Sequence, residues 1–156
     1  MPIMKTFRPF VLAAFAMAIS GCAYLAVHTA PAKVPATTRS EQALQADALF
    51  WKTLHGGDYS GISVALEAVT AAYLATPDDA TTAAHVGFLH IWRIAERGRL
   101  NPVPAIITDD AMLSAKYFRE AVTLDPSDAR YLGFLGTSLL AVGSIDQEEK
   151  TTRDVK

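Results

Sequence analysis

The sequence predicts an all-α protein, and three observations lead to this fold class. From residue 40 onwards alanine is abundant and apolar residues recur at spacings of three and four, the period of a helix with one buried face. Capping residues and glycines separate these stretches, as they do at helix ends. No stretch combines the alternation of a β-strand with turn dipeptides. We therefore expect antiparallel helix hairpins without a sheet.

The composition limits the classes of function. With 156 residues, 51% of them hydrophobic and 19% charged, the chain suits one ordered domain of ordinary size. A formal net charge of −2 provides no basic excess for nucleic-acid phosphates, so we expect no nucleic-acid partner. A single cysteine excludes an intramolecular disulfide framework and a multi-cysteine zinc or iron–sulfur site.

The N-terminus has the pattern of a secretory signal. Lys5 and Arg8 are followed by ten apolar residues, Phe10 to Ile19. Ile19-Ser20-Gly21-Cys22 then resembles the bacterial lipobox, in which small residues let the chain enter a narrow peptidase cleft. The resemblance implies that 1–21 is a lipoprotein signal peptide and that Cys22 carries a diacylglyceryl thioether. Cleavage before Cys22 frees its amine for further acylation.

Removal of the signal would leave 12 basic and 16 acidic residues, a formal charge of −4. Such a chain is not drawn to anionic lipid, and two or three acyl chains would hold it at the membrane. Ala23 stands where aspartate resembles an inner-membrane retention signal in many Gram-negative systems. We therefore expect a lipid-anchored protein of the bacterial cell envelope, on the periplasmic side of the outer membrane rather than on the inner membrane.

Two alternatives remain for this segment. Phe10 to Val27 spans 18 residues, which is long enough for an uncleaved membrane helix. Ala30-Pro31-Ala32 resembles a signal-peptidase site of the A-x-A type, and cleavage there would release a soluble secreted protein.

After the lipobox, residues 22–40 are expected to form an extended tether, because Pro31 and Pro35 interrupt any helix. Its length would place the folded part just beyond the lipid headgroups. Thr38-Arg39-Ser40-Glu41 resembles a capping box and predicts a first helix over Glu41–His55, closed by the glycines that follow it. A second helix is expected over Ser60–Ala75.

The third helix opens at Thr76-Pro77-Asp78-Asp79, with Thr76 as the N-cap, and extends to about Glu96. Residues 97–108 contain two prolines and are expected to form a loop. Thr108 should cap a fourth helix over Asp109–Leu124.

The motif Asp125-Pro126-Ser127-Asp128 repeats the earlier signal and opens a fifth helix over Ser127–Val142. Gly143 is expected to end this helix. The helical domain would then cover 41–143, and 144–156 would be a polar C-terminal tail.

Parts of this pattern resemble the tetratricopeptide repeat (TPR), a helix hairpin of about 34 residues. Leu124-Asp125-Pro126 resembles the end of a repeat, with Phe118 at its aromatic place. Val86-Gly87 and Leu135-Gly136 match the apolar–glycine pair of the first helix, where glycine permits a close helix crossing. The resemblance implies antiparallel hairpins stacked as a short TPR-like α-solenoid over 41–143.

The chain departs from the family pattern in three ways. Pro77 and Pro126 are 49 residues apart, and the loop at 97–108 accounts for most of the excess over one repeat. The first repeat has Leu49-Phe50 without the glycine. The third hairpin is incomplete, which would expose the fifth helix and predicts self-association or a covering partner.

In TPR proteins the first helix of each repeat lines a concave groove. Trp51, Phe88 and Trp92 would form an aromatic floor for an apolar helix or an extended peptide, or they would be ordinary core residues. By count, the groove positions are Asp47, Trp51, His55, Ala84, Phe88, Trp92, Arg130, Gly133 and Thr137. Some TPR domains hold a terminal carboxylate with a Lys/Asn/Arg clamp, and these positions do not contain that clamp.

Arg93, Arg97 and Arg99 cluster where the third helix ends. They would complement the helix C-terminus or contact an anionic group of a peptide, a lipid or a glycan. His85 and His90 are five residues apart, which puts them on different faces of a helix, so we expect no metal site. No known catalytic or cofactor motif occurs, and we expect no cofactor.

These observations predict a membrane-anchored, non-enzymatic scaffold that binds an unidentified protein or peptide in a TPR-like groove. The alternatives are an enzyme or enzyme subunit on the same scaffold, and a homo-oligomeric structural protein built through the fifth helix.

Overall fold

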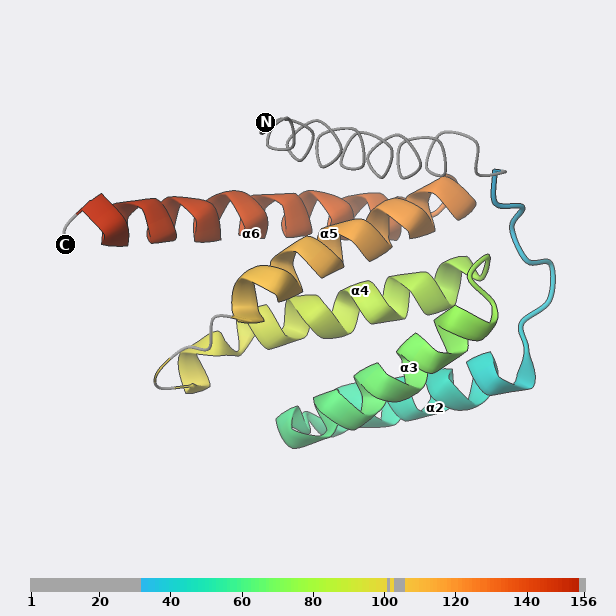
Figure 1. Ribbon diagram of the computed structural model, residues 1–156. Helices are drawn as coiled ribbons and strands as arrows, with labels where there is room; N and C mark the ends of the chain where they lie inside the picture. Colours follow the sequence, from blue (N-terminus) through green and yellow to red (C-terminus); the bar gives the residue numbers. More distant parts are fainter. Residues whose placement is uncertain (1–31, 101, 103–105, 155–156) are drawn as a thin grey trace, which may run out of the picture. The chain divides into compact units, whose positions relative to one another are not determined.

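The computed structural model describes residues 32–100, 102 and 106–154 (Figure 1). The expected all-α fold is confirmed for them, since they contain no strand. The helices belong to one compact unit, Val34–Lys156. The lipobox, Cys22 and both alternative interpretations of the N-terminus lie outside the described residues. The helices are α2 (Glu41–Gly56), α3 (Ile62–Ala75), α4 (Ala80–Ala95), α5 (Ile106–Leu124) and α6 (Ala129–Asp154), with short 3-10 turns at Tyr59–Gly61 and Arg97–Arg99.

The N-cap of helix α2 is Ser40. A capping box over residues 38–41 would have used Thr38, two residues earlier. The Ser40 hydroxyl accepts a hydrogen bond from the backbone N–H of Ala43 at 3.2 Å. At the other end Gly57 has a positive φ of 61°, which glycine adopts without strain, and its N–H donates to the carbonyl of Leu54. The helix end expected at the glycines is therefore confirmed.

The last residues of the expected tether are held to the helices. The backbone N–H of Ala36 donates to the carbonyl of Asp78 at 2.9 Å, and the Arg39 guanidinium donates to the Asp79 carboxylate at 3.0 Å. Residues 36–40 are not helical, as expected, but they pack on the turn between α3 and α4.

Helix α4 is capped by Asp79, not by Thr76. The Asp79 carboxylate accepts hydrogen bonds from the backbone N–H groups of Thr81 and Thr82 and from the Thr82 hydroxyl at 2.6 Å. In the preceding turn the backbone carbonyl of Thr76 accepts a hydrogen bond from the backbone N–H of Asp79. The carboxylate satisfies several N-terminal donors at once and also pairs with Arg39, which explains why the helix begins later than expected.

A small apolar cluster explains why α5 and α6 are longer than expected. Helix α5 begins three residues before the expected start, and Ile107 in this added turn is buried against Ile94, Ala111 and Ile145. Ile145 lies beyond Gly143, so α6 continues through the glycine to Asp154. Burial of a large aliphatic side chain contributes about 1.5–3 kcal/mol, which outweighs the cost of about 1 kcal/mol for a helical glycine.

Successive helices pack against one another in chain order, and α2 and α6 each also contact α4 (Figure 1). The α4–α5 crossing is close because a Cβ at Gly87 would lie 2.9 Å from the Phe118 ring. The expected role of this glycine in close packing is confirmed. At Gly136 a Cβ would meet nothing within 4 Å, so no described segment crosses α6 at the corresponding position.

Candidate functional site

A groove with a volume of about 480 Å³ is formed mainly by α2, α4 and α6, with one residue contributed by α5. It therefore collects side chains from helices that are not consecutive in the chain. We use the name "the groove" for the surface lined by Arg39, Asp47, Phe50, Trp51, Leu54, Thr81, Ala84, His85, Phe88, Phe118, Arg130, Tyr131 and Phe134.

Aromatic rings make up most of the apolar lining. Phe88 lies between Phe50 and Phe134, with edge-to-face ring centroids at 5.6 and 5.3 Å. Phe134 also stacks on Phe118 at 5.2 Å. Phe50 and Phe118 are almost fully buried, whereas Trp51 remains 42% exposed. The buried rings hold the surface in place, and Trp51 offers an apolar face to a ligand.

Charged groups surround this apolar surface. Arg39 pairs with Asp79 at 3.0 Å and lies 3.4 Å from the Asp47 carboxylate. On the α6 side, the guanidinium of Arg130 pairs with Asp128 at 2.6 Å while the Arg130 side chain remains 79% exposed. Burial alone would raise the pKa of Asp79, but hydrogen bonds from Thr82 and Arg39 outweigh it and hold that pKa below its usual range.

His85 stacks on Phe50 with ring centroids 3.9 Å apart. Burial lowers the pKa of His85 to about 4, with Arg39 and Arg130 adding to this effect and the nearby Asp47 and Asp79 opposing it. The imidazole is therefore neutral at neutral pH.

His85 Nδ1 lies 3.1 Å from Asp47 Oδ1, within ion-pair distance. The geometry between the two groups is not that of a hydrogen bond. Both atoms are buried, and neither has a hydrogen-bond partner within the described part of the chain.

The groove brings together some of the residues expected from the repeat count. Trp51, Phe88 and Arg130 line it, and so do Asp47 and Ala84. The other expected positions are not part of the lining. His55 is exposed beside Trp51, with ring centroids 5.3 Å apart, and Trp92 packs against the main core. The expected positions outside the lining are His55, Trp92, Gly133 and Thr137.

Sequence reasoning missed several lining residues. Phe50, His85 and Phe134 are each one or three residues from an expected position, so a wider helix face would have included them. Arg39 precedes α2, and no helical pattern indicates that it would pair with a residue forty positions away. The lining residues missed are Arg39, Phe50, Leu54, Thr81, His85, Phe118, Tyr131 and Phe134.

The three arginines near the end of α4 each have an acidic neighbour. Arg93 lies 3.3 Å from Asp110, and Arg97 lies 3.1 Å from Glu148 on the extended part of α6. Arg99 pairs with Glu96, three residues away. The cations of this cluster are therefore used within the fold.

Two buried hydrogen-bonded groups lie where α4 and α5 meet, apart from the groove, and one of them includes Ser138 of α6. His90 Nδ1 and Asp110 Oδ1 form a hydrogen bond of 2.8 Å, in which the imidazole donates because a carboxylate can only accept. Asp110 is 1% exposed. Ser114 donates to the carbonyl of Gly87 and also bonds to Ser138 at 2.8 Å. None of these side chains lines the groove.

No group of three or more histidine, cysteine or acidic side chains that could hold a metal ion occurs among the described residues. Within the same residues, no helix is long and apolar enough to cross a membrane. Comparisons with protein-family models, with curated proteins and with solved structures found no match to this chain.

Proposed function

We propose that this protein is a lipid-anchored component of the bacterial cell envelope that holds a segment of a partner protein in the groove. The observation that carries the proposal is the groove itself. It has an apolar, largely aromatic surface with charged groups around it, as in a peptide-binding site.

The arrangement of the helices supports a TPR-like unit. The groove draws on α2, α4 and α6, whereas α5 adds one residue and α3 adds none. This alternation is expected when the first helix of each hairpin faces a common groove. The close α4–α5 crossing at Gly87 fits the same pattern.

The chemistry of the groove supports a partner segment with an apolar anchor. Exposed Trp51 beside a rigid group of phenylalanines is the kind of surface that provides binding hot spots. Because His85 is neutral, it adds no positive charge at the centre of the groove. Arg39 and Arg130 are already paired with Asp79 and Asp128. An apolar helix or extended peptide therefore fits better than a strongly acidic segment.

Site-specific photocrosslinking tests the groove. A photoreactive benzophenone side chain in place of Trp51 should form an adduct with a partner protein in the native envelope. The same group in place of Leu74, which is 71% exposed on α3 and lies outside the groove, should not. Equal adducts from both positions, or none from position 51, would refute the groove.

Labelling with a fatty-acid analogue tests the anchor separately. The wild-type chain should take up the label, and Cys22→Ser should not. Label that persists on the Cys22→Ser chain would exclude lipidation at the lipobox and leave the groove proposal untouched.

A further inference from the structure

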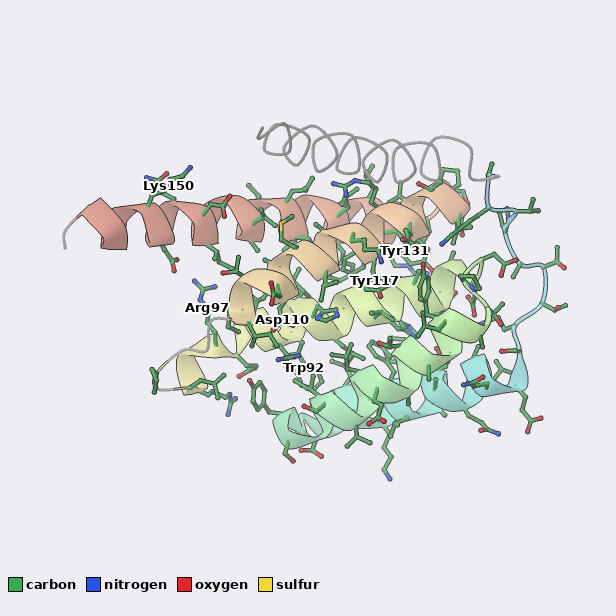
Figure 2. All side chains as sticks on the ribbon, in the orientation of Figure 1. Trp92, Arg97, Asp110, Tyr117, Tyr131 and Lys150 are labelled. Atoms are coloured by element: carbon green, nitrogen blue, oxygen red, sulfur yellow. The ribbon has the colours of Figure 1, made fainter. Side chains whose placement is uncertain are left out.

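The outer face of α6 carries large apolar side chains that no described residue covers. Leu132, Leu139 and Leu140 are 62%, 47% and 77% exposed. Leu132 and Leu139 are seven residues apart, with Leu140 adjacent to the second, so they lie along one side of the helix. The opposite side of α6 faces the rest of the unit through residues such as Tyr131, whose hydroxyl lies 3.4 Å from that of Thr81 (Figure 2).

Glycines lie between these leucines on the same face. Gly136 and Gly143 share the spacing of three and four with Leu132 and Leu139, and Gly133 is seven residues before Leu140. A Cβ at any of the three would meet nothing within 4 Å, in contrast to Gly87. Each glycine makes the helix less stable than alanine would, and no contact within the described chain makes use of the space.

We propose that a second copy of this chain packs its own α6 antiparallel on this face, about a two-fold axis. A two-fold interface places the same surface on both sides, so the surface must fit itself. This face meets that condition because it carries both protruding leucines and the gaps left by glycines. To bind a helix from a different protein, this face would need only the protruding leucines or only the gaps, because the other helix would carry the complementary feature.

The proposal includes a register. With the axis crossing the exposed face at the level of residue 138, Leu140 of each copy lies over Gly136 of the other, and both contacts form at once. The same register puts Gly133 of one copy beside Gly143 of the other. The glycines then let the two backbones approach closely.

Charge fits this register as well. Lys150 lies as far beyond the axis as Pro126 lies before it, so it reaches the acidic turn of Asp125 and Asp128 that opens α6 in the second copy. Figure 2 shows Lys150 on the side of α6 away from α4 and α5. Asp128 pairs with Arg130, and Asp125 accepts a hydrogen bond from the backbone N–H of Ser127. Two carboxylates and one guanidinium give this turn a net negative charge, which a lysine of a second copy would balance. The interface does not involve the groove.

Cysteine crosslinking in membranes from cells that express the full chain tests the register, with Cys22 kept so that the anchor stays intact. The wild-type chain, in which Cys22 is the only cysteine, is the background control and should remain monomeric. Leu139→Cys, close to the axis, should form a disulfide-linked dimer under mild oxidation. Lys150→Cys should not link to itself but should link to Ser127→Cys on a co-expressed copy. Leu74→Cys on α3 is the matched exposed control and should remain monomeric.

Self-crosslinking of Lys150→Cys would contradict the antiparallel register, because it requires parallel helices. Absence of a dimer from Leu139→Cys would overturn the proposal. The face would then be covered by something other than a second copy, or by nothing. In a mild detergent, Leu140→Arg should weaken self-association by about ten- to a hundredfold, since a buried leucine is lost. Leu74→Arg should leave it unchanged, and equal effects of the two variants would also overturn the proposal.

Discussion

At the scale of single residues, His85 is the most unusual titratable group in the groove. The groove surrounds its ring with Phe50 and Trp51, and removal from water disfavours the charged form. Burial in this packing therefore favours the neutral imidazole. The stability of the fold should therefore depend on pH in the range where an ordinary histidine titrates.

We expect the free energy of unfolding to fall as the pH is lowered from about 6.5 to about 4. The pKa of His85 is about 4 in the folded chain and about 6.5 when unfolded, so in this range only the unfolded chain binds the proton. The loss should approach about 3 kcal/mol at the lower pH. Urea unfolding at several pH values measures it. His85→Phe should flatten the dependence, whereas His55→Phe, at an exposed position, should leave it in place.

Gly87 and Gly136 form a natural pair for a test of close packing. Gly87→Ala should destabilise the fold by about 1–3 kcal/mol, because the new Cβ would press on the buried Phe118 ring. Gly136→Ala should stabilise the isolated chain by about 0.5–1 kcal/mol, because alanine favours the helix and meets no neighbour. Thermal unfolding at low protein concentration measures both, and a shift of the same sign would contradict the packing described for α4 and α5.

At the scale of secondary-structure elements, the start of α4 depends on one side chain. Asp79 caps the helix and is 4% exposed, and its carboxylate joins α4 to Arg39 ahead of α2. Thr76 has the residue type of a cap but only its backbone is used at this turn. The two positions should therefore respond very differently to substitution.

Asp79→Ala should cost about 2 kcal/mol or more, because it removes the cap and leaves Arg39 without this partner. Thr76→Ala should change the free energy of unfolding by less than about 0.5 kcal/mol. Chemical denaturation of the two variants provides the comparison. If Thr76→Ala proved as costly as Asp79→Ala, the assignment of the cap would be wrong.

At the scale of the whole unit, the turns added to α5 and α6 join the end of α4 to the far part of α6. Ile94, Ile107 and Ile145 meet there, and Arg97 pairs with Glu148 above them. The segment after Gly143 is therefore packed on the helical unit, although its composition is that of a polar tail.

Removal of residues 144–156 should destabilise the unit by about 2–4 kcal/mol, mainly through the loss of Ile145. Hydrogen exchange should accelerate most around residues 94 and 107, which the truncation leaves uncovered. Ile145→Ala in the full chain should reproduce most of the loss. A truncated chain as stable as the full one would show that the helical unit ends at Gly143.

Local signals in the sequence were sufficient for the all-α class and for the order of five helices between residues 41 and 142, and the resemblance to the TPR pattern indicated the close crossing at Gly87. These features depend on interactions within a turn or two of helix, or on the space that one missing side chain leaves. Trp51, Phe88 and Arg130 were expected on one surface from the count of positions in the repeat that the chain resembles, and all three line the groove.

Only the tertiary structure decided the cap of α4, the true ends of α5 and α6, and the rest of the groove lining. Asp79 outcompetes Thr76 because Arg39 reaches it from forty residues away, and α6 passes through Gly143 because Ile145 meets Ile107. His85 lies in an apolar setting because Phe50 stacks on it from another helix. Burial and ion pairing depend on residues distant in the chain, so no local pattern of spacing can contain them.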